Sequence, residues 1–370
     1  MRSGQLLCCR VFLISILSWM LATTGFAQEI RSGPEVTSDT QLYFPDASGE
    51  WDTVEAAEAG WDRRKLDETL AWAGTVGASS VLVLSNGRIL AEQHWDADPK
   101  TRSFRYQRMF MGVNQQGQPI EDVASVQKSV TSMLVGIAQQ KNLLQIRRPV
   151  SQYLGAGWSK STPDQEDKIT VRHLLSMTSG LDERLQFVAP AGTRWFYNTA
   201  AYSKSRDCLV SVSGMSIHEL TRAWLTDVIG MKESKWTPRP DEIKALNAFG
   251  FATTARDLAR AGLLMQAEGK WAGKQVLGDS RFRLASLRPS QQLRPSYGYL
   301  WWLNDSQRIK TAPKDTYAAN GALGRRVYVT PSQGLVVVRL GDEPNMPDGK
   351  NHDREFWRRL MAARLPTTSR

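Results

Sequence analysis

The sequence predicts an α/β fold of the α+β type: an antiparallel sheet flanked by helices, with an inserted all-helical lobe. Apolar, β-prone runs joined by turn signals occur at residues 79–95 and again at 325–340. Between them, residues 140–285 have helical spacing and almost no strand-like alternation. Strands joined by hairpins are antiparallel, so the two ends of the chain are expected to build one sheet.

The elements near the N-terminus are predicted by caps and turns. Asp62 is a helix cap, and the helix it begins runs to about residue 74. Residues 79–85 and 88–95 are two strands joined by Asn86 and Gly87, which is a strong hairpin signal. Residues 96–120 are predicted to be a loop.

A helix from Ser125 to about residue 140 follows from apolar residues at helical spacing. Further helices are expected at residues 170–177, 200–212, 216–228 and 254–268. Strands are expected at residues 297–303, 317–319, 325–330 and 335–340. A last amphipathic helix is expected at residues 353–363.

These elements give one domain, residues 61–365, after an extended lead-in at residues 28–60. Its sheet part comprises residues 61–140 and 285–365, and its helical lobe residues 141–284. A cleft between the two parts is where a site is expected.

Residues 1–27 are predicted to be a cleaved signal peptide. Arg2 and Arg10 precede or flank an apolar run at residues 11–21, and the small residues Gly25 and Ala27 end it. The run is shorter than the roughly 20 residues that span a bilayer, so no stable membrane anchor is expected after cleavage. The predicted location is therefore the bacterial periplasm or the outside of the cell.

Charge and composition exclude several classes of protein. The two Arg of residues 1–27 have no acid beside them, so cleavage lowers the net charge from +10 to +8. Basic residues are interleaved with acids, which indicates a solvated surface and no nucleic-acid partner. Only Cys208 remains after cleavage, and the four His lack metal-ligand spacing. No metal and no cofactor are expected, and the oligomeric state stays open.

Ser125 and Lys128 are the candidate nucleophile and base. Residues three apart share one face of a helix, so the lysine amine can lie beside the serine hydroxyl. A partly buried lysine with a lowered pKa can accept that hydroxyl's proton. The helix start also offers main-chain N–H groups to a developing oxyanion. Taken alone, this spacing also occurs by chance.

Two further segments can complete such a site. Tyr197, on a loop, can share the proton transfers with Lys128, although a half-buried aromatic is the plainer interpretation. Tyr202 is expected only to pack on the following helix. Residues 320–324 (NGALG) contain glycines that let a substrate approach, and the N–H of Ala322 can join that of Ser125 in an oxyanion hole. An ordinary turn is the alternative.

In this order the three segments resemble the serine β-lactamases and penicillin-binding proteins, and residues 169–181 (ITVRHLLSMTSGL) look like class C β-lactamase-related hydrolases. The similarity runs from about residue 62 to 365. It is greatest to the 6-aminohexanoate-dimer hydrolase and esterase branch, through DVASVQKSV at 122–130, YNT at 197–199, RDLARAG at 256–262 and GYLWW at 298–302. The resemblance implies a β-lactamase/transpeptidase-like fold and an acyl-serine mechanism acting on a small amide or ester.

By the same resemblance, Ser125 is the nucleophile, Lys128 and Tyr197 handle protons, and the Ser125 and Ala322 amides form the oxyanion hole. Substrate contacts are expected from Thr199, Asn320, Gly321 and Arg325. Thr199 replaces the Asn of class C enzymes, and Ala319 and Asn320 replace a cation with Thr or Ser. The missing cation argues against efficient penicillin hydrolysis. Arg325 or Arg326 is a candidate for binding an anion, with solvation at the surface as the alternative.

Two rival functions remain open at this point. One is a penicillin-recognising cell-wall peptidase or weak β-lactamase, and the other is a non-catalytic binding protein with the same fold. No Gly-x-Ser-x-Gly sequence is present, which disfavours an α/β-hydrolase.

Overall fold

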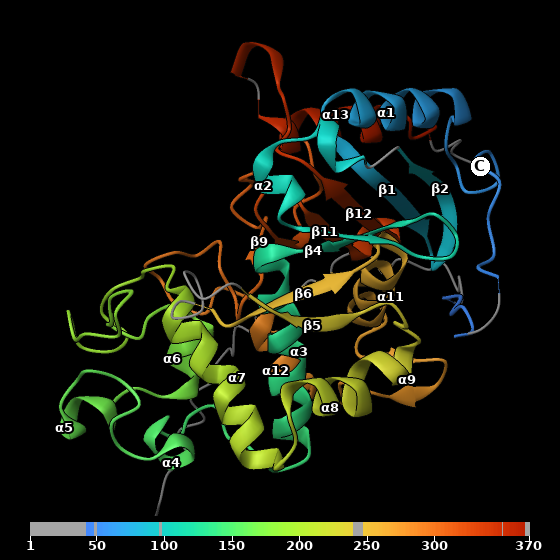
Figure 1. The fold of residues 1–370 in the computed structure, drawn as a ribbon. Coiled ribbons are helices and arrows are strands. Elements are labelled where there is room, and N and C mark those ends of the chain that lie inside the picture. The colour runs from blue at the N-terminus through green and yellow to red at the C-terminus, as the bar shows by residue number, and fades with distance from the viewer. Residues whose placement is uncertain (1–41, 48–49, 96–97, 240–246, 350, 367–370) are drawn as a thin grey trace, which may run out of the picture. The chain divides into compact units, whose positions relative to one another are not determined.

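Strands from the two ends of the chain meet in one six-stranded sheet, as the sequence predicts (Figure 1). The strands are β1 (Ala78–Ser85), β2 (Arg88–His94), β9 (Trp302–Leu303), β10 (Tyr317–Asn320), β11 (Arg326–Thr330) and β12 (Leu335–Gly341). Their order is β2-β1-β12-β11-β10-β9, and every neighbouring pair is antiparallel. Both predicted hairpins, β1–β2 and β11–β12, are present.

The structure is a computed structural model that describes residues 42–47, 50–95, 98–239, 247–349 and 351–366. The predicted signal peptide lies outside these residues. None of the helices within the described ranges has the length and apolar character needed to cross a bilayer.

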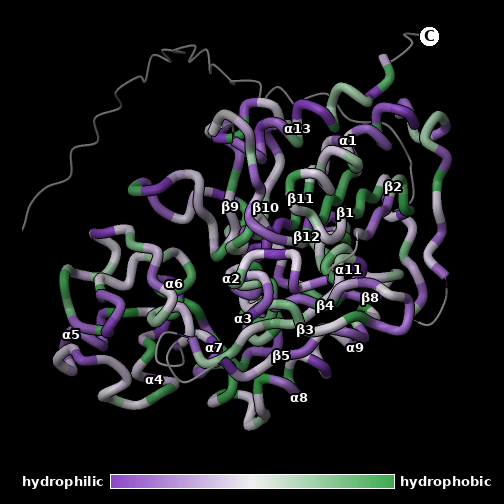
Figure 2. The backbone as a smooth tube through the Cα atoms, turned by 45° about the horizontal axis from the view of Figure 1, so that its top comes forward, coloured by the Kyte–Doolittle hydropathy of each residue, from purple (hydrophilic) through white to green (hydrophobic). Residues whose placement is uncertain are grey.

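Helices cover both faces of the six-stranded sheet (Figures 1 and 2). On one face α1 (Arg63–Thr75) packs beside α13 (His352–Ala362), and α11 (Ala255–Gln266) packs on the other. Along β1, Val81 and Val83 join the core under α1 and α13, whereas Leu82 and Leu84 join the larger core on the α11 side. The strands are therefore apolar on both faces. Asp62 caps α1, as predicted, by accepting the Lys65 N–H.

α11 lies close to the sheet because residue 262 is a glycine. A Cβ at Gly262 would lie 2.5 Å from Val336 Cγ1 and 3.1 Å from Val327 Cγ1. The sequence assigned this helix to the lobe at residues 141–284, but it packs on β1, β11 and β12.

A second, four-stranded sheet corrects the prediction of a loop at residues 96–120. That segment contains α2 (Phe104–Gln107), β3 (Phe110–Val113) and β4 (Pro119–Asp122). β4 pairs with β6 (Phe249–Thr253), which in turn pairs with β5 (Lys235–Pro238). These strands are short and contain Gly, Pro or acids, so their extended shape depends on pairing with distant strands rather than on local propensity.

The predicted strand at residues 297–303 is wrong over most of its length. Only β9 is a strand, because Leu300 has a φ of 63° and turns the chain away from the sheet. The carbonyls of Tyr299 and Leu300 instead accept hydrogen bonds from Ser132 and Ser129 of α3 (Gln127–Gln140), at 2.7 Å each. This segment therefore braces α3 rather than extending the sheet.

The helical part surrounds α3, which is buried along most of its length. Its helices are α4 (Ser151–Leu154), α5 (Pro163–Glu166), α6 (Val171–Leu175), α7 (Thr199–Ser213), α8 (Ile217–Thr221), α9 (Asp227–Ile229) and α12 (Ser280–Ser286). A π-helical segment, Arg222–Thr226, joins α8 to α9, so the predicted helix at 216–228 is continuous. Two short strands, β7 (Lys270–Trp271) and β8 (Lys274–Gln275), form a separate pair.

Candidate active site

Ser125 lies on a constrained turn between the four-stranded sheet and α3. The Val123 N–H donates to the Phe251 carbonyl of β6 at 2.9 Å, which fixes the start of the turn. The Asp122 carboxylate accepts the Ala124 N–H at 2.9 Å, and Ala124 has a φ of 51°. A left-handed alanine persists only where the surrounding structure holds it, and such strain clusters at functional sites.

Lys128 is buried beneath this turn, with 2% of its surface exposed. Its amino group donates to Ser125 Oγ at 3.1 Å, in agreement with the three-residue spacing in the sequence. Burial lowers the pKa of Lys128 to about 7, and the positive charges of Arg239 and Arg206 act in the same direction. At neutral pH a substantial fraction of this amine is therefore unprotonated.

Two tyrosine rings flank the Lys128 amine. Its Nζ lies 4.8 Å from the ring centre of Tyr197 and 4.8 Å from that of Tyr202. Tyr202, for which the sequence indicated only packing on the helix, thus lies beside the amine. The available signal was its position in the first turn of the helix that follows Tyr197.

Tyr197 is held by other aromatic side chains. Its ring stacks on Trp302, with 5.9 Å between ring centres, and meets the edges or tilted faces of Tyr297 and Trp195. Burial raises the pKa of the Tyr197 phenol to about 12, and its interaction with the Ser125 side chain opposes that rise. The phenol is thus protonated at neutral pH and close to the serine. Trp301, by contrast, is buried in the core.

Asn198 fixes the loop that carries Tyr197. Its side-chain oxygen accepts the Ala201 N–H at 2.9 Å and so caps α7. Its amide nitrogen donates to the carbonyls of Leu181 and Asp182. Thr199, a predicted substrate contact, is half-buried as the first residue of α7.

The glycine turn after β10 packs directly against the serine turn. A Cβ at Gly321 would lie 2.4 Å from the main-chain oxygen of Val123, so only glycine fits there. Within the described residues, neither the Ser125 N–H nor the Ala322 N–H donates a hydrogen bond. Both donors are therefore available to an incoming oxygen. Asn320, another predicted contact, has a buried Oδ1 that no described residue pairs with.

The structure corrects the expectation for Arg325. Its guanidinium is 0% exposed and forms an ion pair with Glu121, at 2.7 Å, so it reaches neither solvent nor a substrate anion. Arg326 is also mostly buried, and its Nε lies 3.3 Å from the Asp353 carboxylate. Both guanidinium groups also donate hydrogen bonds to main-chain carbonyls of the turn that precedes them, so both side chains point into the protein.

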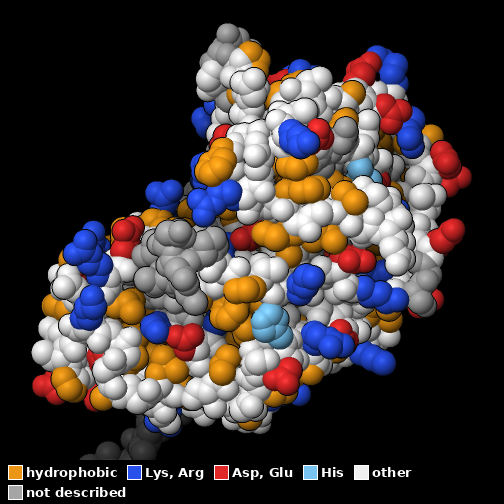
Figure 3. All heavy atoms as spheres, in the orientation of Figure 1, with side chains coloured by type: hydrophobic (Ala, Val, Ile, Leu, Met, Phe, Trp, Pro, Cys, Tyr) orange, Lys and Arg blue, Asp and Glu red, His pale blue; other side chains and the backbone are white. Residues whose placement is uncertain are grey.

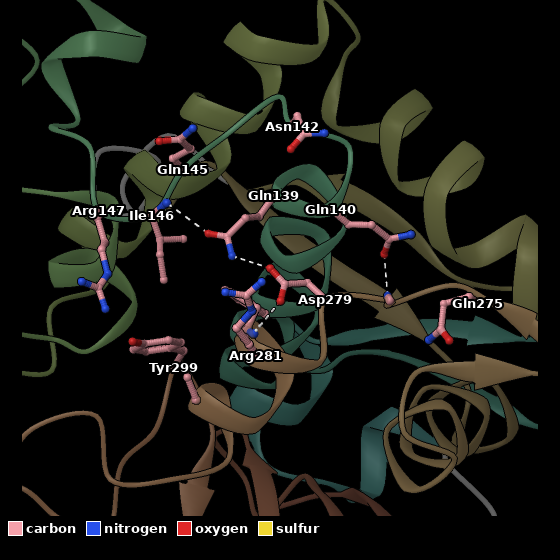
Figure 4. A pocket seen from close by; sticks show the side chains of 13 residues that line it. Gln139, Gln140, Asn142, Gln145, Ile146, Arg147, Gln275, Asp279, Arg281 and Tyr299 are labelled. Atoms are coloured by element: carbon pink, nitrogen blue, oxygen red, sulfur yellow. Dashed lines mark hydrogen bonds between the residues drawn. The ribbon is translucent and has the colours of Figure 1, made fainter.

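A separate polar cavity of about 740 Å³ lies at the far end of α3 (Figure 4). Gln139 donates to Asp279 across it, and Arg147, Arg281 and Tyr299 line it. The residues that line this cavity include no serine–lysine pair. No group of three or more His, Cys, Asp or Glu in the part of the chain described here could hold a metal ion. On the face in Figure 3, Lys and Arg are dispersed among acids and form no stripe.

The chain is similar to a family model and to known proteins. A family model described as Beta-lactamase matches residues 63–360. An uncharacterised protein of Alkalihalophilus pseudofirmus is 24% identical over 78% of this chain and 91% of its own length. The D-alanyl-D-alanine-carboxypeptidase/endopeptidase AmpH of Escherichia coli is 24% identical over 50% of this chain and 51% of its own length.

Solved structures show the same fold. A Bacillus anthracis protein described as a 6-aminohexanoate-dimer hydrolase is 17% identical, with a TM-score of 0.62 over 88% of this chain and 89% of its own. EstCE1, a hydrolase with promiscuous acyltransferase activity, is 16% identical, with a TM-score of 0.61 over 80% of this chain and 97% of its own.

Proposed function

Since this chain belongs to the beta-lactamase family of esterase-, amidase- and penicillin-binding-protein-like hydrolases, we propose that it hydrolyses a small amide or ester through an acyl-Ser125 intermediate. The observation that carries the proposal is the buried Lys128 amine, 3.1 Å from Ser125 Oγ and with a pKa lowered to about 7. A serine hydroxyl becomes an effective nucleophile when such a base takes its proton.

In the proposed acylation step, Ser125 Oγ bonds to the substrate carbonyl carbon while its proton passes to the neutral Lys128 amine. The carbonyl electron pair moves onto oxygen, where the N–H groups of Ser125 and Ala322 stabilise it. When this intermediate collapses, the bond to the leaving amine or alcohol breaks. The leaving group takes the proton from Lys128 through the Tyr197 phenol.

Deacylation reverses these roles with water in place of the leaving group. The oxygen of water bonds to the acyl carbon, and its proton passes through Tyr197 to Lys128. Collapse breaks the bond to Ser125 Oγ, which regains a proton, and releases the acid. No cofactor enters this scheme, because each proton is accepted and returned by the same pair of side chains.

The test is labelling by a fluorophosphonate probe, with mass spectrometry of the modified peptide and nitrophenyl ester hydrolysis measured beside it. We expect the label on Ser125, and Ser125→Ala to lose both label and turnover while keeping its fold, as judged by circular dichroism. Ser129→Ala is the matched control, because its hydroxyl only braces α3 through the Leu300 carbonyl. An unlabelled wild-type protein would favour a non-catalytic binding role, and full activity in Ser125→Ala would refute the mechanism.

A cell-wall peptidase is the second candidate, favoured by the similarity to AmpH over half of that protein. Residues 319 and 320, Ala and Asn, offer no cation for a substrate carboxylate, which favours a small uncharged amide or ester instead. A long-lived adduct with labelled penicillin would support the peptidase. Ester hydrolysis without such an adduct would support the function proposed above.

We also propose that the protein is exported, on the basis of the charged, apolar and small-residue pattern of residues 1–27. Expression of the full chain in a bacterium, followed by fractionation, should yield a periplasmic or secreted protein that begins at Gln28. An intact N-terminus on a cytoplasmic product would contradict this.

A further inference from the structure

Three arginines hold the carbonyl groups of the turn at residues 321–324. The hydrogen bonds run from Arg326 to the Gly321 carbonyl (2.8 Å), from Arg325 to that of Ala322 (3.4 Å), and from Arg339 to those of Leu323 (3.1 Å) and Gly324 (3.0 Å). Every carbonyl of the turn thus accepts a guanidinium N–H. This turn also carries the Ala322 N–H, which the proposed function uses as an oxyanion donor.

The arrangement is costly to the folded state. Arg326 and Arg339 are direct partners in the β11–β12 register, and like charges placed opposite each other destabilise a sheet. Arg339 is buried, and burial together with the charge of Arg326 lowers its pKa to about 10. Leu323 adds backbone strain, with a φ of 60°. A turn without arginine partners would avoid the like-charge repulsion. The arginines are therefore expected to have a role in fixing the orientation of the turn.

Peptide geometry indicates what Arg326 controls. The carbonyl of Gly321 and the N–H of Ala322 belong to one planar, trans peptide unit, so they point in opposite directions. Fixing the carbonyl therefore fixes the direction of the N–H. We propose that Arg326 is a positioning residue, which holds the Gly321 carbonyl and thereby aims the Ala322 N–H at the oxygen that gains charge during acyl transfer.

The charge of Arg326 adds to this effect. A cation on the carbonyl oxygen polarises the peptide unit and makes its N–H a stronger donor. Arg326 is itself oriented by Asp353 of α13, whose oxygen lies 3.3 Å from Arg326 Nε. Burial raises the pKa of Asp353, but the hydrogen bond from His352 and the charge of Arg326 outweigh it and hold that pKa well below its usual range. The carboxylate thus stays ionised at neutral pH.

The inference rests on the proposed function, so its test uses the same ester assay. Arg326→Gln removes the charge and shortens the side chain. We expect kcat to fall about 10- to 100-fold with KM changed less than twofold, because an oxyanion donor acts mainly in the transition state. The affinity for an aryl boronic acid, which forms a tetrahedral adduct on the serine, should fall by a similar factor.

Arg256→Gln is the matched control. It also removes an arginine from an ion pair, with Glu92 at 2.7 Å, but Arg256 does not contact the turn. It should leave kcat, KM and boronic acid affinity unchanged. If Arg326→Gln does not fold, Asp353→Asn replaces it, since this change keeps Arg326 and removes only the group that orients it. That variant should show the same pattern, with a smaller fall in kcat.

Wild-type kinetics and boronic acid affinity in a folded Arg326→Gln protein would overturn the inference. A fall in kcat without a parallel loss of boronic acid affinity would overturn it too, since a misaimed N–H must weaken both. A wild-type protein that neither hydrolyses the ester nor labels at Ser125 would overturn the proposed function as well. The two failures are therefore distinguishable.

Discussion

The Lys128 amine lies 4.8 Å from the ring centre of Tyr202, the same distance that separates it from Tyr197. Tyr202 is buried, and its hydroxyl bonds Thr131 at 2.9 Å and Gln127 at 3.3 Å. The ring therefore cannot turn away from the amine without breaking a buried polar network. A cation near the face of a tyrosine is attracted to it, so the contact restrains the position of the amine.

Ring and hydroxyl of Tyr202 can be separated by mutation. Tyr202→Phe keeps the ring and should keep kcat within about threefold, at a cost of about 1 kcal/mol in unfolding free energy for the lost hydroxyl. Tyr202→Leu removes the ring and should lower kcat at least tenfold. Ester kinetics and urea unfolding measure the two effects. Equal activity in both variants would mean that the ring does not position Lys128.

Replacement of Lys128 by Met should abolish turnover almost as completely as Ser125→Ala, because nucleophile and base act as a unit. Met has a similar length but no charge, so it removes the cost of the buried ammonium. We expect the variant to be at least as stable as the wild type in thermal unfolding at pH 6. Retained ester turnover would show that another group accepts the Ser125 proton.

The pH dependence of activity should report the Lys128 amine. Its neutral form is the base, so kcat/KM should rise about tenfold per pH unit below pH 7 and level off above it. Arg239→Gln removes a positive charge that lowers this pKa, so the rising limb should move to higher pH. A pH profile of nitrophenyl ester hydrolysis measures both, and an unmoved limb in Arg239→Gln would contradict the assignment.

Stability should follow the same titration. The pKa of Lys128 is about 7 in the folded protein and about 10.4 in an unfolded chain. Between these values the unfolded state binds more protons, so the contribution of this residue to stability rises with pH and is least favourable below pH 7. The difference in melting temperature between Lys128→Met and wild type should therefore shrink from pH 6 to pH 10.

Arg325 should prove structural. Arg325→Met leaves the Glu121 carboxylate buried without its partner and should cost about 3–5 kcal/mol of unfolding free energy. Adding Glu121→Gln should recover much of that loss, because Tyr106 and Ser79 can still bond the amide. KM of the double variant should stay near that of wild type. A large rise in KM without loss of stability would restore a substrate role for Arg325.

The six-stranded sheet could be predicted because the local sequence of its central strands is typical of buried strands joined by turns. β1 and β12 are buried over their whole length, carry apolar runs at residues 81–84 and 335–338, and adjoin turns with Asn-Gly or with Pro and Gly. The four-stranded sheet could not be predicted, since β3 and β4 are four residues each and extend only by pairing with distant strands. The chain bends at Leu300 because α3 donates hydrogen bonds to the Tyr299 and Leu300 carbonyls. These donors lie far away in the sequence, so no local sequence pattern predicts the bend.

In the site, too, contacts between residues close in sequence could be predicted, and contacts between distant residues could not. Ser125 and Lys128 are three residues apart, so helix geometry alone brings them together. The partners of Arg325 and Arg326 come from β4 and α13, and two of the aromatic rings that contact Tyr197 are those of Tyr297 and Trp302, far along the chain. Interactions over such separations depend on the complete fold, which is why the sequence suggested anion binding or surface solvation for these arginines and did not predict their buried ion pairs.

The ion pair of Glu121 and Arg325 joins residues 204 positions apart, one in β4 of the four-stranded sheet and one directly before β11 of the six-stranded sheet. Glu121 lies four residues before the serine, and Arg325 lies three residues after Ala322. A growing polypeptide therefore has no assembled reactive centre until its last strands have been synthesised. Catalysis by this chain would report the completion of folding, and a fragment that ends before β10 would be inert however well its helices formed.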